Sequence, residues 1–150
     1  PGHRFGYVNF SKKQIKSLVK LVKILIKKYR IKKDYILGHS DIAPDRKKDP
    51  GEKFPWKILY RNNIGIWHNL NSRKLLCFRR KAASIKETRL FMKQLKKFGY
   101  PCKSIIVKKK MKYKKLLVKA FQRRFRPELI NGNIDQESLL IINNLTRNRA

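Results

Sequence analysis

The residues best suited to carry chemistry lie in one segment, GHSDIAPDRKKDPG, at residues 38–51. His39 directly follows a short apolar run, and Asp49 lies on the Pro-containing loop that comes next. Such a loop can return the carboxylate to the imidazole, and an imidazole with a carboxylate is an ordinary pair of zinc ligands. The same residues also suit a plain polar loop, so their spacing alone leaves both interpretations open.

Two neighbouring polar residues also need an interpretation. Asp41 forms a His-x-Asp pair with His39, but a carboxylate two residues away is better suited to close the loop or orient the histidine than to bind the same metal. His68 comes after the last motif of this half, and we expect it on the surface.

A predicted strand and a predicted loop must position this segment. Residues 34–38 form a short apolar run that stops at Gly38, which predicts a buried strand with His39 at its end. Residues 40–53 are polar and contain prolines and a glycine, which predicts a loop. The strand would hold His39 in one position while the loop brings Asp49 back to it.

Helical patterns lie on both sides of the segment. Apolar residues recur at helical spacing over residues 15–29, and Ser11 with Gln14 makes a capping box before them. Lysines occupy most of the other positions, which indicates a surface helix packed by one face. Residues 54–60 predict a short second helix.

The second half of the chain has a wholly helical pattern. We interpret residues 69–83 as a linker and residues 108–112 as an exposed basic loop, with Asp135 capping the last of three helices. Three short helices in this space predict a small bundle. Their apolar positions are Leu90, Phe91, Leu95 and Phe98; Leu116, Leu117, Ala120, Phe121 and Phe125; and Leu139, Ile142 and Leu145.

The chain is strongly basic, with 40 Lys and Arg against 9 Asp and Glu, a formal net charge of +31 over 150 residues. This charge attracts polyanions such as nucleic acid, anionic lipid or an acidic wall polymer, although abundant Lys, Ile and Asn also reflect an AT-rich genome. Core-like spacing of the aromatic residues and the lack of a nucleic-acid-binding signature weaken the nucleic-acid alternative. No apolar run is long enough to span a membrane.

The two cysteines and the first residue say little about function. Cys77 and Cys102 have no metal-ligand spacing, and both a disulfide and two free thiols remain open. The chain starts at Pro1 without a Met or a signal peptide, and we expect it to be a fragment.

The segment resembles a known signature. The strings GHSDIAP, RK, DPG and FPW, in this order and with matching gaps, are similar to the type-2 N-acetylmuramoyl-L-alanine amidases, zinc enzymes that share a fold with peptidoglycan-recognition proteins. The opening PGHRFGY and Gly65-Ile66-Trp67 extend the similarity over residues 1–68. The resemblance implies the C-terminal part of an α/β amidase domain, a mixed sheet flanked by helices.

The resemblance also implies roles for individual residues. His39 would be the second zinc histidine and Asp49 the carboxylate ligand, with Lys47 stabilising the negative oxygen that develops on the attacked carbonyl. His3 would line the substrate groove. In the family, the first zinc histidine and the general-base glutamate precede the point that corresponds to Pro1. We therefore expect either a longer enzyme or a catalytically incomplete remnant.

A second resemblance covers residues 84–146. Ala120-Phe121-Gln122 and the later G-x-x-D, residues 132–135, are similar to the core of peptidoglycan-binding three-helix modules. The resemblance implies that Gln122 and Arg126 face the ligand, while Phe121 and Phe125 lie in the core. Such a module would hold an enzyme on its polymeric substrate.

Together these observations predict an α/β domain over residues 1–68, a linker over 69–83 and an all-α three-helix bundle over 84–146. The predicted function is zinc-dependent hydrolysis of the amide between N-acetylmuramic acid and L-alanine in peptidoglycan or muropeptides. The alternatives are a peptidoglycan-binding remnant and a basic nucleic-acid-binding protein. We expect a monomer without a transmembrane segment or specific nucleic-acid partner, located in the bacterial cell envelope, in the periplasm or alternatively in the cytoplasm.

Overall fold

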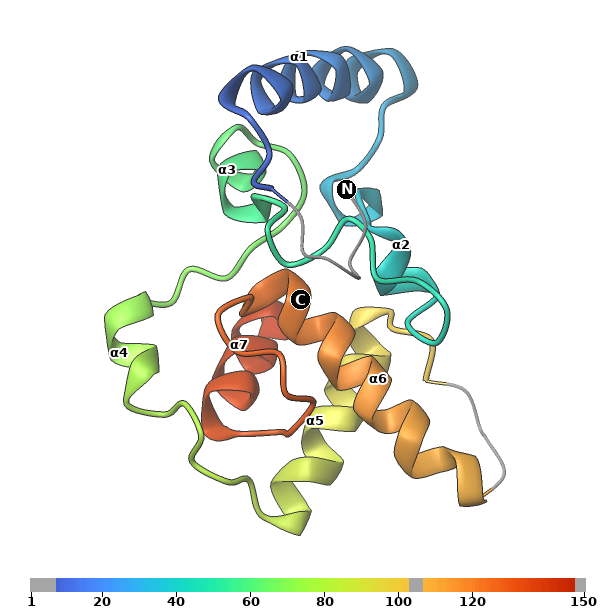
Figure 1. Cartoon of the computed structure of the whole chain (residues 1–150), viewed down its shortest axis with the longest axis vertical. Coiled ribbons are helices and arrows are strands. Elements are labelled where there is room, and N and C mark those ends of the chain that lie inside the picture. Colours follow the sequence, from blue (N-terminus) through green and yellow to red (C-terminus); the bar gives the residue numbers. More distant parts are fainter. Residues whose placement is uncertain (1–7, 103–106, 148–150) are drawn as a thin grey trace.

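The computed structural model describes residues 8–102 and 107–147, which fold into helices joined by loops (Figure 1). The elements in chain order are α1 (Lys12–Tyr29), η1 (Lys33–Tyr35), α2 (His39–Ile42), α3 (Trp56–Arg61), α4 (Ser72–Leu76), α5 (Ile85–Phe98), α6 (Val107–Phe125) and α7 (Gln136–Arg147). Within these two ranges there is no strand, and only an isolated bridge pairs Ala82 with Asp135.

The prediction of an α/β fold with a mixed sheet is wrong for the described part of the chain. Residues 34–38 form no strand, because Lys33–Tyr35 is a single 3₁₀ turn and Ile36 continues in an extended conformation. A strand needs a neighbouring strand for its backbone groups, and the carbonyl of Ile36 instead accepts a hydrogen bond from the Arg124 guanidinium at 3.0 Å. A short apolar run in the sequence does not tell a strand that pairs with another strand from an extended segment that bonds to a side chain.

Helix α1 begins as its sequence predicts. The Ser11 hydroxyl accepts from the Gln14 amide at 3.2 Å, and the Gln14 side chain accepts from the Ser11 amide at 2.8 Å. The apolar face of α1 packs on α3 and its flanking loops, around three buried residues, Trp56, Leu59 and Ile64. We call these three residues the small core.

The three helices predicted in the second half are α5, α6 and α7, and they enclose a larger core. Phe121 and Phe125 are buried in it, as predicted, and Asp135 caps α7 by accepting from the Ser138 amide at 2.9 Å. Residues 108–112 are not a loop, because they belong to the first turns of α6. The buried members of this large core are Leu75, Phe91, Leu95, Phe98, Tyr100, Tyr113, Leu117, Val118, Ala120, Phe121, Phe125, Leu139, Ile141, Ile142 and Leu145.

Residues 69–83 run along the helical half. They contain α4, whose Leu75 is buried in the large core. The Gln136 amide donates to the Lys81 carbonyl at 2.9 Å, and Arg79 makes two hydrogen bonds to the Glu137 carboxylate at 2.7 and 2.8 Å. These contacts attach the segment to α7.

The segment with the candidate chemistry lies between the two cores. Figure 1 shows α1 and α3 at one end of the molecule and α5, α6 and α7 at the other, with α2 and the following loop between them. Helix α2 packs against α6, and Trp67 contacts both cores. In the part of the chain that the structure describes, no helix is both long and apolar enough to cross a bilayer.

Candidate functional site

The structure brings His39 and Asp49 together. His39 is the first residue of α2, and its Nδ1 is in direct contact with Oδ2 of Asp49. The Ser40 amide also donates to the Asp49 carbonyl at 3.0 Å, so the two segments are joined through the backbone as well. The side chains remain open to solvent, His39 at 70% and Asp49 at 48% exposure.

Gly38 allows this close approach. A Cβ atom at this position would lie 2.7 Å from Cδ of Pro50 and 3.3 Å from the Trp56 ring. The first distance is too short for two carbon atoms, so any other residue would push Pro50 away. A glycine before His39 and a proline after Asp49 therefore let the two candidate ligands meet.

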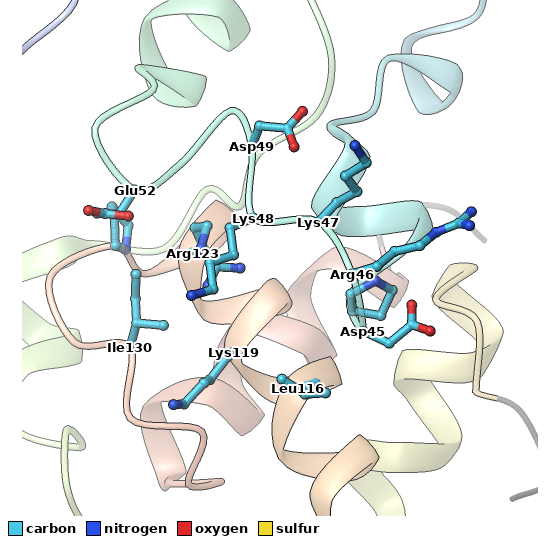
Figure 2. A pocket seen from close by; sticks show the side chains of 12 residues that line it. Asp45, Arg46, Lys47, Lys48, Asp49, Glu52, Leu116, Lys119, Arg123 and Ile130 are labelled. Carbon is cyan, nitrogen blue, oxygen red and sulfur yellow. The ribbon is translucent and has the colours of Figure 1, made fainter. Parts of the chain in front are cut away.

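The electrostatics keep Asp49 ionised. Its hydrogen bond with His39 holds the pKa of the Asp49 carboxyl below its ordinary value, and the positive charge of Lys47 lowers it further. Lys47 is anchored through its backbone amide, which donates to the Ala43 carbonyl at 2.9 Å. Its side chain and that of Asp49 extend to the same side of the loop (Figure 2).

Asp41 is buried and faces the helical half. Its carboxylate accepts from the Gly38 amide at 2.9 Å, from the Tyr100 hydroxyl at 2.7 Å and from the Arg124 guanidinium at 2.5 Å. Burial raises the pKa of Tyr100 well above its ordinary value, so this phenol remains a hydrogen-bond donor. Asp41 closes the turn around His39, and it supports the histidine through the backbone.

The Asp49 side of the loop borders a basic pocket. The pocket has a volume of about 760 Å³ and lies between the loop and the surfaces of α6 and the segment after it (Figure 2). A smaller and more apolar hollow of about 290 Å³ lies on the side of His39, against α1 and Trp56. The charged residues that line the larger pocket are Arg46, Lys47, Lys48, Lys119 and Arg123 with Asp45, Asp49 and Glu52.

The donor pair fits part of a zinc site. An imidazole nitrogen and a carboxylate oxygen are ligands that zinc prefers, and here they are adjacent and accessible. Catalytic zinc takes three protein ligands and an open position. Within residues 8–102 and 107–147, no group of three or more His, Cys, Asp or Glu could hold a metal ion. These residues therefore offer two ligands of such a site.

Gln122 and Arg126, which the resemblance places against a ligand, are both buried. Their hydrogen bonds are made within the helical half. The Gln122 amide donates to the Asn133 carbonyl at 2.8 Å and accepts from the Gly132 amide at 2.8 Å. Arg126 donates to Asp135 at 2.5 Å. Matching residues in a motif cannot tell a turn-closing side chain from a ligand-binding one.

The other two histidines differ from expectation or lie outside the described residues. His68 is buried rather than on the surface, because it stacks on Trp67 with ring centres 5.1 Å apart at the junction of the two cores. Burial lowers the pKa of His68 to about 4. His3 lies outside the described residues.

Sequence reasoning missed Arg124 and Tyr100. They lie 83 and 59 residues from Asp41 in the chain, and no local pattern connects residues so far apart. The one available signal was the His-x-Asp pair, whose carboxylate needed a partner.

The chain is similar in sequence to several known proteins. Residues 2–52 match the N-acetylmuramoyl-L-alanine amidase family. The chain is 33% identical to the N-acetylmuramoyl-L-alanine amidase AmiD of Escherichia coli over 90% of this chain and 48% of that protein. It is 47% identical over 49 residues to the 1,6-anhydro-N-acetylmuramyl-L-alanine amidase AmpD of Haemophilus influenzae, over 32% of this chain and 27% of that one.

Solved structures extend the similarity to both halves of the molecule. E. coli AmiD in complex with the substrate anhydro-N-acetylmuramic acid-L-Ala-D-gamma-Glu-L-Lys superposes with a TM-score of 0.79 and 31% identity, covering 95% of this chain and 54% of that one. AmpDh3 from Pseudomonas aeruginosa in complex with anhydromuramic pentapeptide gives 0.78 and 32%, covering 95% and 55%. The chain is thus similar to N-acetylmuramoyl-L-alanine amidases and spans about half the length of AmiD.

Proposed function

We propose that this chain is the part of a zinc-dependent N-acetylmuramoyl-L-alanine amidase that supplies two metal ligands and an oxyanion-stabilising lysine. The contact between His39 and Asp49 carries the proposal, because it joins a nitrogen and an oxygen ligand in the very loop that matches the family. The substrate would be the amide between N-acetylmuramic acid and L-alanine in peptidoglycan or a muropeptide. Relatives with this activity and the substrate-bound AmiD structure support that choice.

In the proposed reaction, the C–N bond of the amide breaks, and water supplies the hydroxyl of the new carboxyl group and the proton of the new amine. His39 and Asp49 would hold the zinc ion. When bound, zinc would polarise the amide carbonyl and activate water. Lys47, on the same side of the loop as Asp49, would place its ammonium against the oxygen that becomes negative as the carbonyl is attacked.

Zinc content and product release test this proposal. The chain would be assayed for bound zinc after dialysis and for release of stem peptides from purified sacculi and from anhydro-muropeptides. Asp49→Ala should lose the zinc, and Asp45→Ala is the matched control, since Asp45 is an exposed carboxylate of the same loop. Zinc bound equally by wild type and Asp49→Ala would contradict the ligand assignment.

A second candidate function is binding to peptidoglycan without hydrolysis. It rests on the resemblance of residues 84–146 to peptidoglycan-binding three-helix modules. Retention on sacculi at high salt with no released peptide would support it, whereas binding that collapses with salt would indicate attraction of the +31 charge to polyanions. In either case, we place the site of action on peptidoglycan, in the bacterial cell envelope; a cytoplasmic enzyme that acts on recycled muropeptides is the alternative.

A further inference from the structure

The two halves of the molecule meet in a buried polar network beside the candidate metal site. At its centre, Asp41 and Arg124 form an ion pair whose side chains are 4% and 3% exposed. Tyr100, which follows α5, donates to the same carboxylate. A buried carboxylate with three donors is held in one position, since moving it would leave several groups without partners.

Arg124 donates hydrogen bonds to the segment around His39 at two residues. One terminal nitrogen donates to Asp41 at 2.5 Å, and the other donates to the carbonyl of Ile36 at 3.0 Å. His39 lies between these two attachment points. The guanidinium also lies 4.2 Å from the centre of the Trp56 ring, the ring that would lie 3.3 Å from a Cβ atom at Gly38. The fork geometry of arginine lets one residue from α6 fix both ends of this short segment.

The described residues offer no sheet that could hold the segment. The segment 36–41 has no neighbouring strand in the described chain, and its backbone oxygen at Ile36 bonds to a side chain. Two of its attachments in the described chain, at Ile36 and Asp41, come from the helical half. Metal sites of this kind lose affinity when the groups that orient their ligands are displaced, even when the ligands themselves are intact.

We propose that Arg124 and Tyr100 are positioning residues for the zinc site, so that the helical half orients His39 toward Asp49 in addition to any role in binding peptidoglycan. This inference rests on the proposed function. It assigns the helical half a part in metal binding that the resemblance to a peptidoglycan-binding module does not imply.

The test compares two pairs of variants. Arg124→Met removes the fork, and Arg79→Met is its control, since Arg79 makes two hydrogen bonds to Glu137 inside the helical half. Tyr100→Phe removes one hydroxyl, and Tyr113→Phe is its control, since the Tyr113 hydroxyl donates to the Pro101 carbonyl at 2.6 Å. Thermal unfolding of every variant identifies those that stay folded.

The first readout is the affinity for zinc alone, measured by competition with a chromophoric chelator. We expect Arg124→Met to weaken zinc binding about 10–100-fold and Tyr100→Phe to weaken it less, as for other groups that orient metal ligands. Arg124→Lys, which keeps the charge with one donor group, should recover part of the loss. The two control variants should bind zinc as wild type does.

The second readout does not need the metal. In ¹⁵N-histidine-labelled protein, the ring nitrogens of His39 should give one set of signals in wild type and in the controls, and averaged signals in Arg124→Met. Folded Arg124→Met and Tyr100→Phe with wild-type zinc affinity and unchanged His39 signals would overturn the inference. If wild type binds no zinc, the proposed metal site fails, and the ring signals alone decide whether the helical half positions His39. If Arg124→Met does not fold, Tyr100→Phe decides.

Discussion

The two halves of the molecule differ in the size of their apolar cores, and the candidate ligands lie in the half with the smaller core. The large core holds fifteen buried apolar residues of the described chain, whereas the small core beneath α1 holds three. The candidate ligands nevertheless belong to the side of the small core, on a loop whose functional side chains are exposed. The half with the smaller core thus carries the candidate ligands, and the half with the larger core contributes two of the hydrogen bonds that hold their loop.

Two carboxylates of the loop, Asp41 and Asp49, also differ in burial and in their partners. Asp41 is buried and takes three hydrogen bonds, two of them from the helical half. Asp49 is half-exposed and contacts His39. The Asp41 carboxylate is held by hydrogen bonds within the protein, whereas the Asp49 side chain is still 48% exposed to solvent.

Alanine substitutions in the two cores should differ in how much they lower the free energy of unfolding. Phe121 is fully buried and packs against Phe91 and Phe125, so Phe121→Ala should cost about 3–5 kcal/mol in the free energy of unfolding. Leu59→Ala in the small core should cost about 2–3 kcal/mol. Urea unfolding followed by circular dichroism measures both. A larger cost for Leu59→Ala would contradict the proposed division of stability.

The junction between the cores should show a pH dependence. Burial lowers the pKa of His68 to about 4 from an ordinary value near 6.5, so between these values the unfolded chain binds more protons than the folded one. Stability should therefore fall by about 2–3 kcal/mol as the pH drops from 6.5 to 4. Chemical unfolding across this range measures the loss. His68→Gln should remove much of this dependence of stability on pH. An unchanged dependence would show that other groups cause it.

Gly38→Ala should affect zinc binding more strongly than the free energy of unfolding. The added methyl group would clash with Pro50 and press on Trp56, at a cost of about 1–3 kcal/mol in unfolding free energy. Because the clash separates the segments of His39 and Asp49, zinc binding should be lost in protein that is still folded. Gly99→Ala is the control: Gly99 has a positive φ of 111° and open space around it, so it carries a backbone cost without a clash at the site. Zinc binding equal in both variants would contradict the role of Gly38.

Loss of a helix cap should lower the free energy of unfolding only slightly in either half of the molecule. α1 and α5 each begin with a capping box, Ser11 with Gln14 and Ser84 with Glu87. Ser11→Ala and Ser84→Ala should each cost about 1 kcal/mol in unfolding free energy. In Ser11→Ala, hydrogen exchange should increase only in α1, since this helix packs on the small core. In Ser84→Ala, it should increase across α5 and α7. Hydrogen exchange that increases over the same helices in both variants would indicate that the two halves unfold as one cooperative unit.

Local patterns in the sequence predicted much of the helical structure. The capping box before α1, the apolar spacing of α5, α6 and α7, and the Asp135 cap are all found in the structure. The pairing of His39 with Asp49 also followed from local features, a short loop with suitable turn residues and a matching motif. Each of these depends on residues that are near one another in the chain.

The errors concern properties that depend on distant residues. The run at 34–38 has a strand-like composition, but in the described chain it meets Arg124 rather than another strand. His68, Gln122 and Arg126 are polar, and polarity suggests exposure, yet all three are buried. The last two fill hydrogen bonds within the helical half, and His68 is covered by the junction of the cores.

Capping, helical periodicity and turn formation act over a few residues, so local patterns identified the starts of α1 and α7 and the loop that carries His39 and Asp49. The pairing of Asp41 with Arg124 and Tyr100, and the burial of the polar residues of the motif in the helical half, depend on the tertiary structure. The physical reason is that burial of a polar group is stable only with partners, and those partners come from parts of the chain that folding alone brings together.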